Sequence, residues 1–270
     1  MTERVKALIL TAPLIAILAC LGWLLICPHR PECVLALTRL DSWIPVSGTV
    51  ALPLLGLSLL LWLLRVVWLL TGAALAVRRL PRAGIAPPEL SLASSRAGMN
   101  RVSCLAGETP TAFCAGALRP RVLVSDGLVR QLGSEELQVV LLHEREHARR
   151  LEPLVRSALQ AAAEVFFYVP IVRWWAERQI ESSELRADRV AIKRLGRRPV
   201  AAALWALGGG APMRGTAAFG GVAELRVAQV LGDPLPRRAP NFSIVVLSAM
   251  GAYLALQVGS CLGHATTPLV

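Results

Sequence analysis

The chain has 270 residues, of which 54% are hydrophobic and 17% charged, and its mean hydropathy is +0.54. This composition is too apolar for an ordinary soluble domain of that length, so we expect membrane-spanning segments. The net charge is +11, but no patch interleaves aromatic and basic residues, which argues against direct nucleic-acid binding. Orientation in a membrane explains the charge better.

Three apolar segments predict transmembrane helices. Residues 7–27 are uncharged and have about the length that crosses a bilayer. A signal peptide is the alternative reading, but the apolar run continues beyond the faint cleavage signal at Cys20, where a mature N terminus should turn polar. Residues 50–77 are interrupted only by Arg65, which either snorkels or marks the inner end of a shorter span. Residues 242–262 are again uncharged, so we expect about three spans in a multi-pass membrane protein.

Basic residues orient these spans. Arg78, Arg79 and Arg82 follow the second span, and Arg4 and Lys6 precede the first, whereas the loop between the spans has no basic excess. We therefore expect the N terminus and the region after Arg78 on the cytoplasmic side of the cell membrane. The predicted parts are two spans with a short external loop (1–77), a cytoplasmic linker (78–100), a folded domain (101–240) and a last span with its tail (241–270).

The folded domain is predicted to be α+β, mostly helical with a small antiparallel sheet. A helix is expected from Ser134, a plausible N-cap, with Glu135 and Glu136 placed favourably in its first turn. Three short strand candidates separated by turn signals precede this helix: 101–106, 111–115 and 121–125.

The predicted helix contains an H-E-x-x-H motif, His143-Glu144-Arg145-Glu146-His147. Residues four apart share one helical face, so His143 and His147 can bind one zinc ion, with Glu144 in reach of a water molecule beside it. Zinc would acidify that water, and Glu144 would take its proton as general base. A charged, solvated helix face is the alternative, but two of only four histidines have this spacing. The motif predicts a zinc-dependent enzyme that hydrolyses peptide bonds.

A third metal ligand must come from elsewhere in the chain. Glu177, Glu181, Glu184 and Asp188 form an acidic stripe at helical spacing, and the spacing alone does not rank them. H-E-x-x-H followed by E-x-x-A-D resembles the glutamate-ligated zinc peptidases, or gluzincins. The resemblance implies that Glu184 is the third zinc ligand and that Asp188 orients His143. Glu181 is the rival ligand, but we interpret Glu177 and Glu181 as parts of a solvated helix face.

A longer pattern narrows the resemblance. Residues 111–153 run from an apolar strand through R-P-R to E-L-Q-V-V-L-L-H-E. This is similar to the antirepressor-type membrane zinc peptidases, the family of the β-lactam-sensing transducers. Glu152 stands before a proline where that family typically has aspartate. More distant kin are the membrane quality-control zinc proteases, and the resemblance as a whole implies a membrane-anchored gluzincin domain.

The segment 154–175 is apolar enough to be mistaken for a span, although Glu164 and Pro170 interrupt it. If it crossed the membrane once, Glu184 could not share a metal with the two histidines. We therefore expect it to pack in the fold or to enter the membrane and return, with Pro170 kinking or ending one helix and a second helix over about 172–195.

Other features complete the prediction for the domain. The glycine-rich segment 207–222 should be a loop, followed by a short helix over 223–231. The zinc ion itself, Tyr168 or an arginine must stabilise the oxyanion, because no further histidine is available on that side. Cys104 and Cys114 are expected to be small buried hydrophobic residues.

Taken together, these features predict a membrane-bound zinc metalloendopeptidase that cleaves cytoplasmic-side protein substrates. We expect a regulatory role, with a transcriptional repressor or the chain itself as substrate and the lipid membrane as the other partner. The alternatives are a quality-control protease for membrane proteins and a non-catalytic, zinc-bearing scaffold, against which Glu144 argues. The strand 111–115 is expected to offer an exposed edge to which an extended substrate adds.

Overall fold

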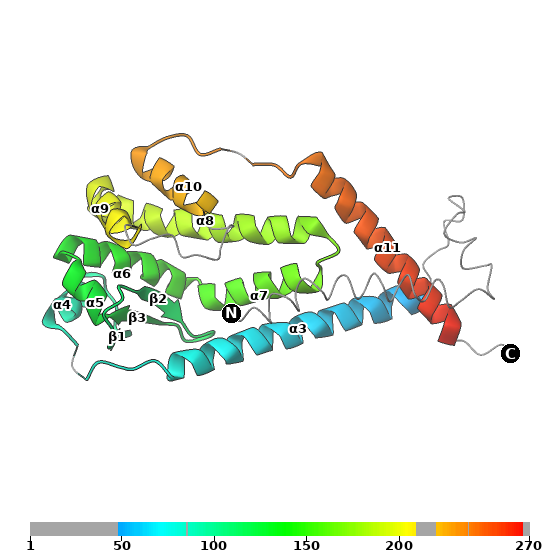
Figure 1. Cartoon of the computed structure of the whole chain (residues 1–270), viewed down its shortest axis with the longest axis horizontal. Coiled ribbons are helices and arrows are strands. Elements are labelled where there is room, and N and C mark those ends of the chain that lie inside the picture. Colours follow the sequence, from blue (N-terminus) through cyan, green and yellow to red (C-terminus); the bar gives the residue numbers. More distant parts are fainter. Residues whose placement is uncertain (1–47, 85, 209–219, 237, 267–270) are drawn as a thin grey trace. The chain divides into compact units, whose positions relative to one another are not determined.

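The computed structural model describes residues 48–84, 86–208, 220–236 and 238–266 (Figure 1). Residues Leu55–Tyr253 form one compact unit, which contains the sheet and the site described below. The elements are α3 (Gly48–Arg78), α4 (Pro88–Arg96), β1 (Val102–Leu105), β2 (Ala112–Ala115), β3 (Arg121–Ser125), α5 (Asp126–Gln131), α6 (Ser134–Arg149), α7 (Glu152–Val165), α8 (Pro170–Leu195), α9 (Arg197–Gly208), α10 (Gly220–Leu231) and α11 (Phe242–Thr266).

One helix of the described part, within α3, is long and apolar enough to cross a membrane, over Leu54–Arg78. Helix α11 begins where the last span was expected, but its described apolar part, Phe242–Leu256, is shorter than that criterion requires. The first expected span, 7–27, and the external loop lie outside the described residues. The structure thus supports one of the three expected spans and leaves the other two as predictions.

The three strands form a mixed sheet in the order β1-β3-β2. Strand β2 pairs with β3 in antiparallel fashion, whereas β1 pairs with β3 in parallel, so the prediction of a purely antiparallel sheet was wrong. The chain after β1 crosses the end of β3 before it returns as β2. Gly127 permits this crossing, because a β-carbon there would lie 2.0 Å from the Glu108 carbonyl oxygen. Strands β1 and β2 are therefore the two edges of the sheet.

The linker expected over 78–100 is partly structured. Its residues 88–96 form α4, in which Pro88 occupies the first turn, a position that proline tolerates well. The three- and four-residue spacing of Leu90, Ala93 and Ala97 puts three apolar side chains on one face, and all three are buried in the main core. This helix packs against α6, so the folded domain begins before residue 101.

Helix α6 lies between α4 and the sheet on one side and α8 on the other. Its N-cap is Gly133 rather than Ser134, and no side chain caps it, whereas Glu135 and Glu136 lie in the first turn as expected. Leu137, Leu141 and most of the apolar residues between them are buried, which anchors the helix in the core. The polar residues that follow therefore have a fixed orientation.

Helices α7 and α8 form an antiparallel hairpin, so the segment 154–175 turns back instead of forming one crossing helix (Figure 1). A hydrogen bond of 2.6 Å from Ser183 Oγ to Glu152 Oε1 joins the two helices near the start of α7. Helix α7 ends at Val165 and α8 begins at Pro170, so this proline starts a helix and does not kink or end one, and α8 starts two residues before the expected position. Helix α10 contains the short helix expected over 223–231, and residues 209–219 of the expected loop lie outside the described part.

Candidate metal centre

Helix α6 presents both histidines of the H-E-x-x-H motif toward α8. His143 Nε2 and His147 Nε2 are 2.9 Å apart, and both side chains are buried. The buried turn before them, which includes Leu141 and Leu142, holds this end of the helix against the core. Helical periodicity therefore brings the two imidazoles to one point, as their spacing of four predicts.

Glu184 on α8 completes a cluster with the two histidines. Its Oε2 is 3.3 Å from His143 Nε2, and its Oε1 is 3.7 Å from His147 Nε2. Ligand atoms around a tetrahedral zinc ion at about 2.0–2.1 Å are roughly 3.3 Å apart. The three observed separations of 2.9, 3.3 and 3.7 Å bracket that value. The donors and their spacing therefore fit zinc, and the three residues form a candidate metal site.

The second nitrogen of His143 is held by Asp188. His143 Nδ1 is 2.8 Å from Asp188 Oδ1, so donation from Nδ1–H to this carboxylate leaves Nε2 turned toward the cluster. Arg226 of α10 donates two hydrogen bonds to the same carboxylate, of 2.6 and 2.8 Å, and its Nη1 is 3.5 Å from Glu184 Oε2. A chain of contacts thus runs from α10 through Asp188 to His143.

A second arginine reaches Glu184 from the start of α7. Arg156 Nη2 donates to Glu184 Oε1, and Arg156 Nε donates to Glu152 Oε1 at 3.2 Å. Glu152 is itself buried and also accepts the hydrogen bond from Ser183. Helix α7 therefore contributes one basic and one acidic side chain to the site through its first turn and a half.

These contacts shift the pKa values of the two histidines in opposite directions. Burial lowers the pKa of His143, but its hydrogen bonds to Asp188 and Glu184 outweigh burial and raise that pKa to about 9. Burial, together with the charge of His143, lowers the pKa of His147 to about 3. The contacts of His143 therefore favour its protonated form, whereas the surroundings of His147 favour its neutral form.

The carboxylates near the cluster also have shifted pKa values. Burial raises the pKa of Glu144, against the opposing charge of His143. Burial also disfavours ionised Glu184 and Asp188, but hydrogen bonds from His143 and the nearby arginines prevail and lower the pKa of both. The two residues on α8 are therefore held as carboxylates, as metal ligation and histidine orientation require.

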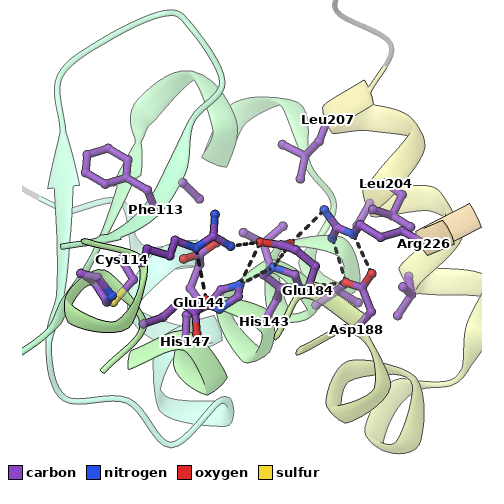
Figure 2. A pocket seen from close by; sticks show the side chains of 18 residues that line it. Phe113, Cys114, His143, Glu144, His147, Glu184, Asp188, Leu204, Leu207 and Arg226 are labelled. Atoms are coloured by element: carbon purple, nitrogen blue, oxygen red, sulfur yellow. Dashed lines mark hydrogen bonds and ion pairs between the residues drawn. The ribbon is translucent and has the colours of Figure 1, made fainter. Parts of the chain in front are cut away.

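A cavity of about 340 Å³ opens over the cluster. Glu144 lines it beside the histidines, and β2 and α9 form opposite walls, with Phe113 on one side and Leu207 on the other (Figure 2). The α9 wall is apolar and consists of Val200, Ala203, Leu204 and Leu207. A peptide group that enters the cavity would meet the cluster, Glu144 and the edge of β2 together.

Two acidic residues of the predicted stripe lie outside the cluster. Glu181 is ion-paired with Arg178 and buried, so the prediction that it belongs to a solvated face was wrong. Glu177 is partly exposed and pairs with Arg173. The structure thus brings together His143, His147, Glu184 and Asp188 and leaves the rival ligand Glu181 aside.

Sequence reasoning named an arginine among the oxyanion candidates but identified neither of the two arginines of the site. Tyr168, one of the suggested oxyanion donors, lies in the turn at the far end of the α7–α8 hairpin and does not line the cavity, whereas Arg156 and Arg226 do. A signal for Arg156 was its spacing of four from Glu152 on a predicted helix. No local pattern marks Arg226, whose contact with Asp188 spans 38 residues.

Comparison with known proteins supplies an independent observation. A family model described as BlaR1 peptidase M56 matches residues 50–204. This range includes α3, the sheet, the H-E-x-x-H helix and Glu184, and it ends before Arg226. No curated protein and no solved structure gives a significant match.

Proposed function

The chain belongs to the BlaR1 peptidase M56 family, and from this premise we propose that it is a zinc endopeptidase with His143, His147 and Glu184 as metal ligands. Family membership supports a peptidase held in a membrane, in agreement with the apolar helix α3. The observation that carries the zinc proposal is the separation of the three donor pairs, between 2.9 and 3.7 Å. These distances match the edges of a zinc coordination tetrahedron.

The proposed mechanism assigns the proton transfers to Glu144. Zinc, when bound, would lower the pKa of the attacking water and polarise the scissile carbonyl. Glu144 accepts the proton of that water and delivers it to the leaving amine, since it lines the cavity beside the ligands. Its raised pKa, caused by burial, suits a group that must both take up and release a proton.

The neighbouring charged residues have positioning roles in this proposal. Asp188 keeps the proton of His143 on Nδ1, so that Nε2 is available to the metal. Arg226 holds Asp188 by two hydrogen bonds and is therefore a positioning residue for His143. Arg156 and Arg226 are also the basic side chains of the cavity, so we propose one of them for the oxyanion in place of Tyr168.

The substrate is proposed to bind in extended form along β2. This strand is an edge of the sheet, and Ala112, Phe113 and Cys114 line the cavity. Main-chain hydrogen bonds to such an edge hold a peptide without a long sequence motif. The apolar wall on α9 favours a substrate with a hydrophobic side chain next to the scissile bond. Flexible protein segments are accordingly the proposed substrate class.

The proposed role is regulatory cleavage on the cytoplasmic side. The basic cluster Arg78, Arg79 and Arg82 at the end of α3 supports this orientation, because cytoplasmic loops carry such an excess. A linker in a repressor or another membrane-proximal regulator would meet the requirement for a flexible segment. Quality control of membrane proteins is the second role that we propose.

The experiment compares the wild type with Glu144→Gln in membranes and cytosol of expressing cells. Loss of the general base should lower hydrolysis by about 10²–10⁴-fold, with zinc content unchanged because Glu144 is not a ligand. One or a few fragments that appear only with the wild type would support regulatory cleavage, and many fragments of membrane proteins would support quality control. Equal fragment patterns for the two chains would contradict the peptidase proposal.

A further inference from the structure

The turn between α7 and α8, defined here as residues 166–172, has no charged side chain. Between Arg156 and Arg173 the sequence contains a single charged residue, Glu164. The side chain of Phe167 is 56% exposed in the described part of the chain, and those of its neighbours are partly exposed. A run of aromatic and aliphatic residues at the tip of a helical hairpin is an unusual surface to leave in water.

Apolar helices flank the turn on two sides. On one side, Ser248 Oγ of α11 accepts a hydrogen bond of 2.8 Å from the Ile171 backbone, and a β-carbon at Gly251 would lie 1.7 Å from the Tyr168 carbonyl oxygen. On the other side, Trp62 of α3 donates to the Ala158 carbonyl at 3.0 Å. The outward apolar side chains of both helices are exposed; on α11 they include Phe242, Val245, Val246, Leu247, Met250 and Tyr253.

The charges of these apolar segments pair with each other. Arg65 is the only charged residue in the sequence from 48 to 77, and its Nε lies 2.5 Å from Glu164 Oε2. The two residues are 99 positions apart in sequence. A charge that faces water needs no partner, and an exposed pair contributes little to stability. A charge surrounded by hydrocarbon is costly unless it is paired, and the two lone charges of these segments meet that requirement by pairing with each other.

We propose that the α7–α8 turn is immersed in the same bilayer as α3, with lipid acyl chains as its binding partner. Lipid fits better than a protein partner because the hairpin contacts α3 and α11, whose outward side chains are also exposed and apolar, and because the two charged residues among these segments, Arg65 and Glu164, are paired with each other. The patch ends at Arg173, which is paired with Glu177 and whose long side chain can reach headgroups. The hairpin thus enters the bilayer and returns.

If the chain is the peptidase proposed above, immersion of the turn in the bilayer also determines which substrates can reach the metal centre. Pro153, in the first turn of α7, lines the cavity, and α7 ends where the turn begins. At 1.5 Å per residue, the helix separates the cavity from the turn by roughly 20 Å. The metal centre would therefore lie close to the membrane surface, and its substrates would be segments that approach that surface.

The test measures access of water to the turn and needs no peptidase activity. Full-length Phe167→Cys and a matched control, Leu92→Cys on α4, are placed in nanodiscs of phosphatidylethanolamine and phosphatidylglycerol and treated with a charged maleimide. The native residues are 56% and 53% exposed in the protein, so the chain itself shields the two positions about equally. We expect Phe167→Cys to react at least about tenfold more slowly, because a thiol in apolar surroundings ionises poorly.

Two controls make the outcome decisive. The unsubstituted chain gives the background from its own six cysteines, and denaturation in detergent should abolish the difference between the variants. The unsubstituted chain is also irradiated in nanodiscs that contain lipids with a diazirine on the acyl chain, which should modify peptides of 166–172 and of α3 but not α4. Equal maleimide rates, or shielding of Phe167→Cys without lipid adducts on the turn, would overturn the proposal. Loss of peptidase activity would affect neither readout.

Discussion

The two ends of the α7–α8 hairpin differ in charge. At one end, Glu152, Arg156, Glu184 and Asp188 form ion pairs and hydrogen bonds around the candidate metal centre. At the other end, residues 166–172 carry no charge. The same two helices therefore support a polar environment around the candidate metal centre and an apolar surface. Both environments are built on the same secondary structure. The positions of the charged residues along the hairpin therefore distinguish the polar end from the apolar end.

The two ends of the hairpin also differ in their long-range ion pairs, which are Arg226–Asp188 near the metal centre and Arg65–Glu164 near the turn. Arg226 makes two hydrogen bonds to Asp188 within a network that includes His143 and Glu184. Arg65 makes one to Glu164, and neither of these two belongs to the metal cluster. Loss of the first pair should act on metal binding, and loss of the second should act on stability in the membrane. The following predictions separate these effects, from the largest to the smallest.

The largest effect is expected at the site end of α8. Glu184→Ala removes one of three donors and should weaken zinc binding by far more than the roughly 10–100-fold loss that outer partners of zinc ligands cause. Glu181→Ala is the matched control three residues away and should bind zinc normally, since Glu181 pairs with Arg178 instead. Zinc content and competition with a chelator measure the difference. Loss of zinc in Glu181→Ala with retention in Glu184→Ala would reverse our assignment.

The second prediction concerns the acidic character of the cavity. Burial and the charges of Glu144 and Glu152 raise the pKa of the Cys114 thiol from 9.0 to about 12. Because the pKa is raised, the reactive thiolate is scarce below pH 12, and alkylation at pH 8 should be about 1000-fold slower than for an ordinary thiol. The rate should keep rising about tenfold per pH unit above pH 9, where an exposed thiol has levelled off.

Peptide mapping by mass spectrometry after alkylation checks this prediction. The control is Leu118→Cys in the exposed turn between β2 and β3, and Glu144→Gln should accelerate the reaction of Cys114. A rate for Cys114 that levels off near pH 9 would mean that the cavity lacks the proposed acidic, low-dielectric character.

Features that depend on residues close together in the sequence were predicted better than features that depend on distant contacts. Helical periodicity is a local pattern that can be recognised in the sequence. It predicts the positions of His143, Glu144, His147 and the acidic residues of α8. The family resemblance assigned Glu184 and Asp188, and the structure brings both to the histidines. Glu181 has similar spacing, and its pairing with Arg178 distinguishes it only in three dimensions.

Features set by distant contacts could not be predicted. The parallel pairing of β1 with β3 depends on the path of the chain past Gly127, and short strands carry no signal for direction. The core role of α4 was hidden because a segment rich in Pro, Ser and Ala has the composition of a linker. Arg226 joins the site through contacts formed only on folding, and its helix follows residues 209–219, which interrupt any periodic pattern.

The third prediction tests Arg226 as a positioning residue. Arg226→Gln leaves Asp188 without its two charge-assisted hydrogen bonds, so we expect zinc affinity to fall by about 10–100-fold, as is usual for outer partners of ligands. Arg226→Lys retains the charge but not the bidentate geometry and should recover part of the loss. Chelator competition gives the affinity, and the absorption spectrum of the cobalt-loaded protein reports the ligand geometry. Unchanged affinity and spectrum in Arg226→Gln would exclude the positioning role.

The smallest effect is expected at the Arg65–Glu164 pair. Arg65→Met and Glu164→Gln each leave one charge without its partner and should each destabilise the chain, whereas the double variant removes both charges and should be more stable than the sum of the two losses predicts. In water, a pair with side chains 36% and 35% exposed would couple by only about 0.2–1 kcal/mol. A larger coupling, measured as a double-mutant cycle from reversible unfolding in mixed micelles, would indicate a low-dielectric environment.

Arg173→Met and Glu177→Gln form the matched control pair at the start of α8, where the arginine side chain is 73% exposed, and should couple weakly. Equal coupling in the two cycles would remove the electrostatic argument for a lipid environment around Glu164 and leave the ion pair as an ordinary surface contact.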